Sequence, residues 1–219
     1  ELESSRLDTT RALVKAMSQL KRPPRVLLNA SAVGYYGTSP DGHFTEKSPC
    51  GQDFLAHLCE RWEAAAAAKP SATRLVVVRI GIVLGPDGGA LGKMLPVFRL
   101  GIGGPVGSGL QWMSWIHRTD LCQLIEKALK ERAWSGVVNG VAPEPVPMAS
   151  FAEVLGTTLG RPSLLPVPGP LLKILLGDGA RVVLEGQQVV SERLAGLGFR
   201  FKYPDLCQAL SAATMPTPH

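Results

Sequence analysis

The sequence predicts an α/β fold built on a doubly wound parallel sheet, followed by a small and mainly helical unit. Two apolar runs, at 26–28 and 74–80, are short and continuous, which is typical of strands buried on both faces. A segment with helical spacing precedes each run, over 1–20 and 53–68. Helix, buried strand, helix, buried strand is the order that produces a parallel sheet covered on both sides.

The individual elements have recognisable limits. Pro23 and Pro24 end the first helix, and Asp53 can cap the second, which stops before Pro70. The apolar positions of the second helix recur every four residues and are Phe54, Leu58, Trp62 and Ala66. A third helix is predicted from Thr119-Asp120 to about 132, with Asp120 as its cap, and a short strand at 137–139.

The number of predicted strands indicates how much of the sheet this sequence can form. Two strong strands and two weak ones are too few for a doubly wound sheet. We therefore expect the sheet to be incomplete at its amino-terminal side, with two βαβ units, on the order of 60 residues or more, before Glu1.

Composition excludes several classes of protein. The net charge of +5 comes from dispersed basic residues, without the basic, aromatic stripe of a nucleic-acid surface. The longest charge-free stretch, 100–117, contains five glycines and a proline, so no membrane segment is expected. Four cysteines without a C-x-x-C pair, namely Cys50, Cys59, Cys122 and Cys207, indicate reduced thiols in the cytoplasm and no metal site.

Polar residues cluster directly after the first predicted strand. Ser31, Tyr35 and Tyr36 lie in the segment NASAVGYYG at 29–37. Ligands of parallel sheets bind where strands end, so these hydroxyls are candidate hydrogen-bond donors to a bound carbonyl or hydroxyl. A glycine-rich turn with aromatic packing explains the same residues equally well.

Four segments in chain order resemble motifs of the extended short-chain dehydrogenase/reductases, the NAD-dependent epimerase/dehydratase family, which have a Rossmann-like fold. They are 29–37 (NASAVGYYG), 44–49 (FTEKSP), 78–86 (VRIGIVLGP) and 115–121 (WIHRTDL). Trp112, together with 184–187 and 198–199, is similar to the atypical "epimerase family proteins", which carry a short extra carboxy-terminal domain. The resemblance extends from about residue 5 to about residue 210.

Two departures from that family concern its chemistry. Gly101, Gly104 and Gly107 have the spacing of the phosphate loop, but they follow a helical pattern and include Pro105, so we reject them as that loop. The catalytic Tyr-x-x-x-Lys pair is also missing, because its two positions on the second helix are Leu55 and Cys59, or Phe54 and Leu58 in a register shifted by one residue. A phenol without the lysine that lowers its pKa is a poor acid–base catalyst at pH 7.

The resemblance divides the chain into two parts. Residues 1–150 correspond to the carboxy-terminal part of an NAD(P)-binding domain with a substrate loop at 86–116, and residues 151–219 to a small domain. Helical segments of the small domain are expected at 171–176 and 180–197.

The resemblance also implies a set of site residues. Ser31, Tyr35 and Tyr36 are the catalytic candidates. The cofactor, NADP or alternatively NAD, would contact Ala30, Ser31, Ile80, Gly81, Ile82 and Val83. The substrate would contact Gln111, Trp112, Trp115 and His117. His117 is also a candidate acid, although a structural role before Asp120 is favoured.

The implied function is that of an NAD(P)(H)-dependent oxidoreductase or epimerase acting on a small hydroxyl- or carbonyl-bearing compound, of which a nucleotide sugar is one example. Its partners would be that small molecule and a second subunit in a homodimer. The missing catalytic pair supports a rival interpretation, a non-catalytic dinucleotide-binding sensor or structural protein. The sequence leaves the substrate, the choice of cofactor and the oligomeric state open.

Overall fold

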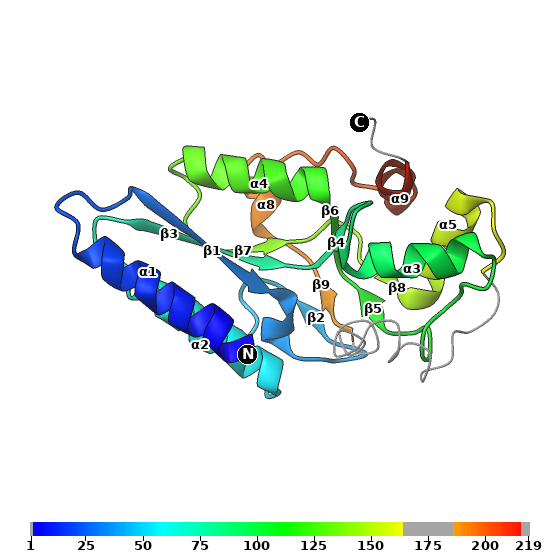
Figure 1. Ribbon diagram of the computed structural model, residues 1–219, viewed down its shortest axis with the longest axis horizontal. Coiled ribbons are helices and arrows are strands. Elements are labelled where there is room, and N and C mark those ends of the chain that lie inside the picture. The colour runs from blue at the N-terminus through cyan, green and yellow to red at the C-terminus, as the bar shows by residue number, and fades with distance from the viewer. Residues whose placement is uncertain (1, 164–185, 216–219) are drawn as a thin grey trace.

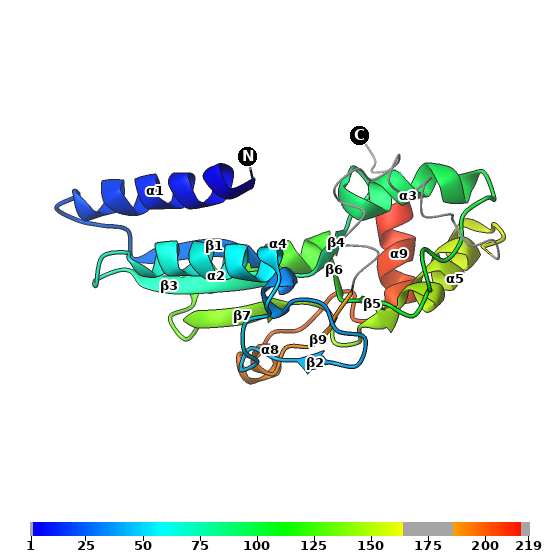
Figure 2. The same ribbon diagram turned by 90° about the horizontal axis from the view of Figure 1, so that it is seen from below.

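A computed structural model describes residues 2–163 and 186–215 (Figure 1). Its main sheet has three parallel strands in the order β1-β3-β7, formed by Val26–Ala32, Arg74–Ile80 and Gly136–Gly140. Helices α1 (Thr9–Ser18) and α2 (Phe54–Ala67) lie on one side of the sheet and α4 (Arg118–Lys130) on the other (Figures 1 and 2). The α/β fold with a parallel sheet is therefore confirmed.

Alternation along the strands explains why helices cover both faces. Leu27 and Leu75 pack with Val14, Met17 and Ala66 of α1 and α2. The neighbouring positions Val76 and Val78 pack on the other face, where their cluster includes Leu124, Ala128, Trp134 and Val138. Successive side chains of a strand point to opposite faces, so a continuous apolar run is what a doubly covered strand requires.

The strand β3 continues into β4 (Ile82–Leu84) through Gly81, where the chain changes its pairing partner. The amide of Gly81 donates to Gly140 O of β7, while that of Ile82 donates to Ser114 O beside β6 (Trp115–His117). A Cβ on Gly81 would lie 2.4 Å from Ser114 O, so only glycine fits. This junction places 80–83 at the end of the sheet.

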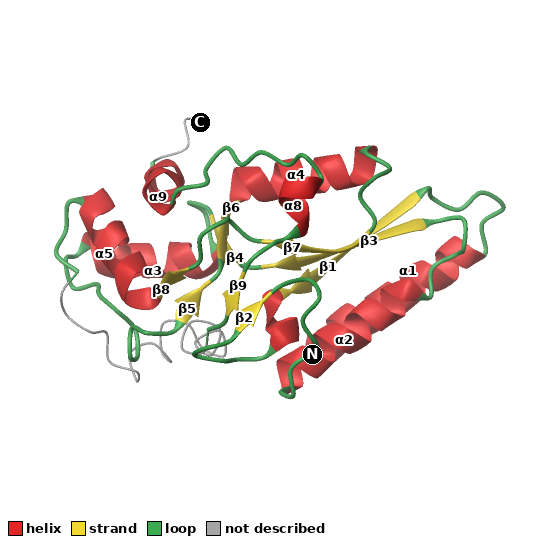
Figure 3. Cartoon of the chain, turned by 180° about the vertical axis from the view of Figure 1, so that it is seen from behind, coloured by secondary structure: helices red, strands yellow, loops and turns green. Residues whose placement is uncertain are grey.

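A second, mainly helical region is assembled from three parts of the chain (Figure 3). Helices α3 (Gly89–Arg99), α5 (Met148–Leu159) and α9 (Leu206–Thr214) share one apolar cluster. Its largest fully buried side chains include Leu91, Trp115 and Phe151. Strand β5 (Trp112–Met113) pairs antiparallel with β8 (Val146–Pro147) at its edge.

Shorter elements complete the described chain. A π-helical turn, η1 (Ser4–Asp8), precedes α1, and the 3-10 turn η2 (Val33–Tyr36) follows β1. Strand β2 (His43–Phe44) pairs in parallel with β9 (Gln188–Val189), and the short helix α8 (Arg193–Gly196) follows. No helix of the described residues is long and apolar enough to cross a membrane.

Several sequence predictions can be compared with these bounds. The strand at 74–80 and the Asp53 cap, whose carboxylate accepts from Ala56 N at 2.9 Å, are confirmed. The first strand runs on to Ala32, further than the apolar run indicated, because parallel pairing with β3 tolerates Asn29 and Ser31. The segment 86–116 contains α3, with Leu91, Leu95 and Phe98 buried, in agreement with the helical pattern before Gly101, and its role as a substrate loop stays a prediction.

The division at residue 150 stays a prediction. Helix α5 spans that position, and its cluster joins α3 from one side of the boundary to α9 from the other. The predicted helix at 171–176 and the first part of 180–197 lie outside the described residues. The described end of 180–197 is not one helix, because it contains the strand β9 before the short helix α8.

Candidate functional site

A cavity of about 650 Å³ lies at the carboxyl ends of β1 and β3 and beside the start of β4. Ser31 and Ala32 end β1 at its wall, and 80–83 form the neighbouring part. The remaining lining comes mainly from η2, α2 and the start of α3, with Leu2, Arg6, Trp112, Ser114 and Gln187. A mostly apolar cavity at strand ends is the usual place for a ligand in this kind of sheet.

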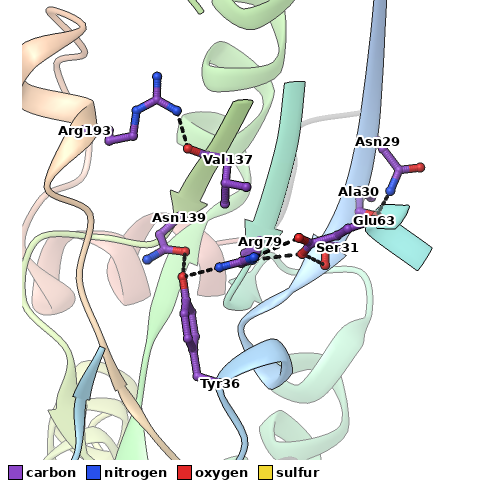
Figure 4. A network of polar contacts seen from close by, with 9 residues as sticks. All are labelled: Asn29, Ala30, Ser31, Tyr36, Glu63, Arg79, Val137, Asn139 and Arg193. Atoms are coloured by element: carbon purple, nitrogen blue, oxygen red, sulfur yellow. Dashed lines mark hydrogen bonds and ion pairs between the residues drawn. The ribbon is translucent and has the colours of Figure 1, made fainter. Parts of the chain in front are cut away.

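A buried ion pair, drawn in Figure 4, is hydrogen-bonded to Ser31 of the cavity wall. Arg79 of β3 donates from Nε and Nη2 to the two carboxylate oxygens of Glu63 on α2, each at 2.8 Å. Their side chains are only 4% and 12% exposed. Burial by itself lowers the pKa of Arg79, but the bonds to Glu63 and the nearby Tyr36 raise it overall. The guanidinium therefore remains charged, and its bidentate geometry offsets the cost of burial.

Tyr36 connects this ion pair to the next strand (Figure 4). Its hydroxyl accepts from Arg79 Nη1 at 3.0 Å and donates to Asn139 Oδ1 of β7 at 2.7 Å. Asn139 Nδ2 in turn donates to Val190 O at 2.8 Å. Burial raises the pKa of Tyr36, with Arg79 opposing. The phenol is therefore fully hydrogen-bonded and remains protonated at neutral pH.

Tyr35 has a different environment. Its half-buried ring lies against the guanidinium of Arg79, with the ring centroid 3.2 Å from Cζ. Burial raises the pKa of this phenol too, against the opposing charge of Arg79. Neither tyrosine lines the cavity. Their roles as catalytic groups stay predictions.

Ser31 lines the cavity and belongs to the same network. Its Oγ donates to Glu63 Oε1 at 2.7 Å. A carboxylate paired with a guanidinium only accepts hydrogen bonds, so the serine must supply the proton. Ser31 therefore has only lone pairs left for the cavity. In this geometry Ser31 can accept a hydrogen bond from a ligand hydroxyl or N–H, but its proton is not available for a ligand carbonyl.

Leu55 and Cys59, at the positions of the missing catalytic pair, both line the cavity from α2. Cys59 is only 6% exposed. Burial raises the pKa of its thiol, while the amide of Ala32 and the hydroxyl of Ser31 oppose that rise. This wall accordingly offers an isobutyl group and a protonated thiol where proton transfer would need a phenol and an ammonium.

The residues predicted to contact the cofactor lie close to this cavity. Ser31, Ile80, Gly81, Ile82 and Val83 line it. Ala30 is one residue further back on β1, where it pairs with Val78 and its carbonyl accepts from Asn29 Nδ2 at 2.8 Å.

The predicted substrate residues are more dispersed. Trp112 lines the cavity, and its indole N–H donates to Pro40 O at 3.1 Å. Gln111 is buried and donates to Val106 O at 2.7 Å, while Trp115 is buried in the apolar cluster of the helical region and donates to Glu144 O. Neither is among the side chains that line the cavity.

His117 is the N-cap of α4, and its Nδ1 accepts from Thr119 N at 3.1 Å. Its ring lies 4.1 Å from that of Tyr203, centroid to centroid, and does not line the cavity. Asp120 is therefore wrong as the cap. Its buried carboxylate instead accepts from Lys202 N and Tyr203 N, at 2.6 and 3.0 Å, and anchors the carboxy-terminal segment to α4.

The glycines at 101–107 have the surroundings that led to their rejection. They follow α3 rather than a strand, and the next regular element is β5 rather than a helix. Gly103 packs on the ring of Phe98, and no glycine of this run lines the cavity. Gly101, Gly104 and Gly107 therefore do not form the strand–glycine loop–helix unit that binds a phosphate.

Sequence reasoning did not select Glu63, Arg79 or Asn139 as site residues. Arg79 carried a usable signal, because a charged side chain inside the run RLVVVRI needs a buried partner. The sequence does not identify that partner, because Glu63 on α2 approaches Arg79 only in the folded chain. The same holds for Asn139 on β7, which joins the network through Tyr36.

Comparison with known proteins gives the family. Residues 2–139 match the NAD dependent epimerase/dehydratase family, and 167–213 match a domain of unknown function, DUF1731. The chain is 50% identical to the Arabidopsis thaliana "Epimerase family protein SDR39U1 homolog, chloroplastic" over 97% of its length, but spans only 62% of that protein.

Two solved structures extend the comparison. The human epimerase family protein SDR39U1 (isoform 2), crystallised with NADPH, aligns with a TM-score of 0.91 at 41% identity, over 97% of this chain and 72% of that one. A nucleoside-diphosphate sugar epimerase from Corynebacterium glutamicum aligns with a TM-score of 0.79 at 30% identity, over 97% and 42%. The sheet, the strand-end cavity and these matches agree, and the chain belongs to the NAD dependent epimerase/dehydratase family.

Proposed function

We propose that this protein binds NADP(H) and acts as an oxidoreductase on a small compound that carries a hydroxyl or carbonyl group. The observation that carries the proposal is the cavity formed jointly by Ser31–Ala32 and 80–83 at the strand ends. The human relative with the same fold was crystallised with NADPH. When bound, the nicotinamide supplies the hydride chemistry.

The lining fits the nicotinamide side of such a cofactor. Ile80, Ile82 and Val83 offer apolar contact to a ring, and Gly81 has no side chain to obstruct it. The residues that would hold the nicotinamide end are thus Ser31 and 80–83. The glycines at 101–107, which have the spacing of a phosphate loop, do not line this cavity.

Ser31 and Glu63 would accept the proton that leaves the substrate hydroxyl. A substrate hydroxyl donates to the free lone pair of Ser31, whose own proton already points at Glu63 Oε1. As the substrate oxygen loses its proton to Ser31 Oγ, the serine proton moves to the carboxylate. This short relay would replace the absent phenol and ammonium.

A second candidate is a non-catalytic dinucleotide-binding protein. Leu55 and Cys59 at the cavity wall favour it, as do the raised pKa values of Tyr35 and Tyr36. None of these groups readily exchanges a proton at neutral pH.

The experiment uses the protein in its full length and measures NADPH affinity by calorimetry. NADPH oxidation is followed with a panel of small carbonyl compounds, and NADP reduction with the matching alcohols. We expect Ser31→Ala to lower turnover on the order of a hundredfold, because it removes the hydroxyl that takes the substrate proton and passes its own to Glu63. Affinity for NADPH should stay nearly unchanged.

Ser18→Ala, on α1 and outside the cavity lining, is the matched control and should alter neither quantity. If the wild type binds NADPH but turns over none of the compounds, the second candidate gains. Turnover that survives Ser31→Ala contradicts the relay, and absence of NADPH binding contradicts the whole proposal.

Two further predictions concern the cellular location and the oligomeric state of the protein. We keep a cytoplasmic location and a homodimer as predictions, although the plant relative is named as chloroplastic. Fractionation of the source cells and light scattering of the purified protein test them.

A further inference from the structure

A second constellation of reactive side chains lies outside the cavity, at the beginning of α2. It consists of Cys50, from the preceding loop, and His57 and Glu60 of the helix. Their ligand atoms (the thiol sulfur, a ring nitrogen and a carboxylate oxygen) all lie within 4.8 Å of one another. His57 Nδ1 and Glu60 Oε2 are 3.7 Å apart, because residues three apart share a helix face.

The loop that carries Cys50 is fixed against the rest of the molecule. The amide of Gly51 donates to Tyr35 O at 2.9 Å. A Cβ on Gly51 would lie 2.6 Å from Gly37 N, so the two backbones touch and only glycine fits. Two residues later, Asp53 caps α2 through Ala56 N. Both sides of the loop are anchored, which sets Cys50 beside the first turns of α2.

The donor set selects among metal ions. A thiolate, an imidazole and a carboxylate together suit Zn²⁺, whereas Mg²⁺ and Ca²⁺ take oxygen ligands. Ligand atoms around tetrahedral zinc are about 3.4–3.8 Å apart, given bonds of about 2.0–2.3 Å. Closing the present separations to that range needs only small side-chain rotations. His57 and Glu60 have that freedom, since their side chains are 51% and 55% exposed.

We propose that Cys50, His57 and Glu60 form a zinc-binding site with a fourth coordination position open to solvent. Cys50 is half-buried and the other two ligands are exposed, so the ion can enter directly from water. The site adjoins the cavity, because the loop at 50–53 packs on Gly37, and both Gly37 and Asp53 line the cavity. A bound ion would therefore hold the cavity rim to α2. The proposal does not depend on the protein being an oxidoreductase.

The test uses the full-length protein, stripped of metal and kept reduced. Zinc is titrated by calorimetry, and Co²⁺ is used as a spectroscopic probe because thiolate ligation gives an intense near-ultraviolet charge-transfer band. We expect one strong site per chain and a cobalt band. Cys50→Ser should abolish the band and weaken zinc binding at least tenfold, while His57→Gln and Glu60→Gln should each weaken binding.

The matched controls are Cys122→Ser and Cys207→Ser, which alter exposed cysteines elsewhere, and His43→Gln. These should leave the affinity and the band unchanged. Circular dichroism confirms that each variant is folded. The proposal is overturned if the wild type binds no zinc, if Cys50→Ser keeps the band, or if a control removes it.

Discussion

Two buried polar clusters lie at the ends of strands in this molecule and perform different tasks. The Glu63 cluster comprises Ser31, Tyr36, Glu63, Arg79 and Asn139 and adjoins the cavity. The His117 cluster comprises His117, Thr119, Asp120, Lys202 and Tyr203 and joins α4 to the carboxy-terminal segment. In the first, a cation faces a carboxylate. In the second, a carboxylate faces backbone amides.

A polar residue at a strand end is therefore not by itself a site residue. Ser31 and His117 both follow or end a strand, and both were candidates from sequence. Only Ser31 faces the cavity, because β1 ends there, whereas the ring of His117 turns back onto its own helix. Four substitutions test this contrast, from the largest expected effect to the smallest.

Glu63→Ala should have the largest effect on stability. It leaves the buried guanidinium of Arg79 without its carboxylate, which typically costs about 3–5 kcal/mol. Urea unfolding measures the loss. Glu126→Ala, which breaks the exposed ion pair with Lys130, is the control and should give no resolvable change. Equal midpoints for both variants would show that the Glu63 cluster is not a structural unit.

Tyr36→Phe should have an intermediate effect. Removing the hydroxyl leaves Asn139 Oδ1 and one N–H of Arg79 unpaired in a buried place, at about 1–3 kcal/mol. Tyr35→Phe is the matched control, and we expect a smaller change because that residue is more exposed. The same urea experiment applies, and the reverse order of effects would contradict the assignment of Tyr36 to the network.

His117 should make stability depend on pH. Burial, opposed by Asp120, lowers the pKa of His117 in the folded protein. The unfolded chain, with a pKa near 6.5, then binds the proton more tightly. The contribution of His117 to stability is therefore present above about pH 6.5 and is lost as the pH falls through the folded value. Protonation also removes the Nδ1 lone pair that accepts from Thr119 N.

The measurement is the free energy of unfolding between about pH 7.5 and 5.5, across the ordinary histidine pKa. His117→Asn keeps a capping acceptor but does not titrate, so its stability should fall less with decreasing pH. His43→Gln, at an exposed position outside both the His117 cluster and the proposed zinc site, is the control. An identical pH profile for His117→Asn and the wild type would contradict the role of His117 as a neutral cap.

Cys59→Ala should have the smallest effect on any turnover that the protein shows. The pKa of this thiol is raised by burial, so it stays neutral and does not replace an ammonium. We expect less than a tenfold change, under about 1.4 kcal/mol in the barrier. A loss of a hundredfold or more in NADPH oxidation, with folding and NADPH affinity intact, would reveal a catalytic thiol.

Parts of the site were readable from local sequence. The segments 29–37 and 78–86 were identified as strand ends, and the cavity lies between them. Local sequence does not show that Trp112 lines the cavity while Gln111 and Trp115 do not. All three lie within five residues, and only the pairing of β5 and β6 with strands from elsewhere decides which of them reaches the cavity.

The sequence alone determined the α/β class, the limits of α2 and β3, and the absence of a catalytic phenol and ammonium on α2, because periodicity, caps and residue identity are local. Tertiary structure alone decided what those residues do. Ser31, Glu63 and Arg79 are 16 to 48 positions apart in the sequence. In the folded chain Glu63 accepts a hydrogen bond from Ser31 and forms an ion pair with Arg79. Whether Ser31 donates or accepts toward a ligand depends on where its proton goes. That direction is fixed by Glu63, a partner that packing of α2 on the sheet brings within 2.7 Å.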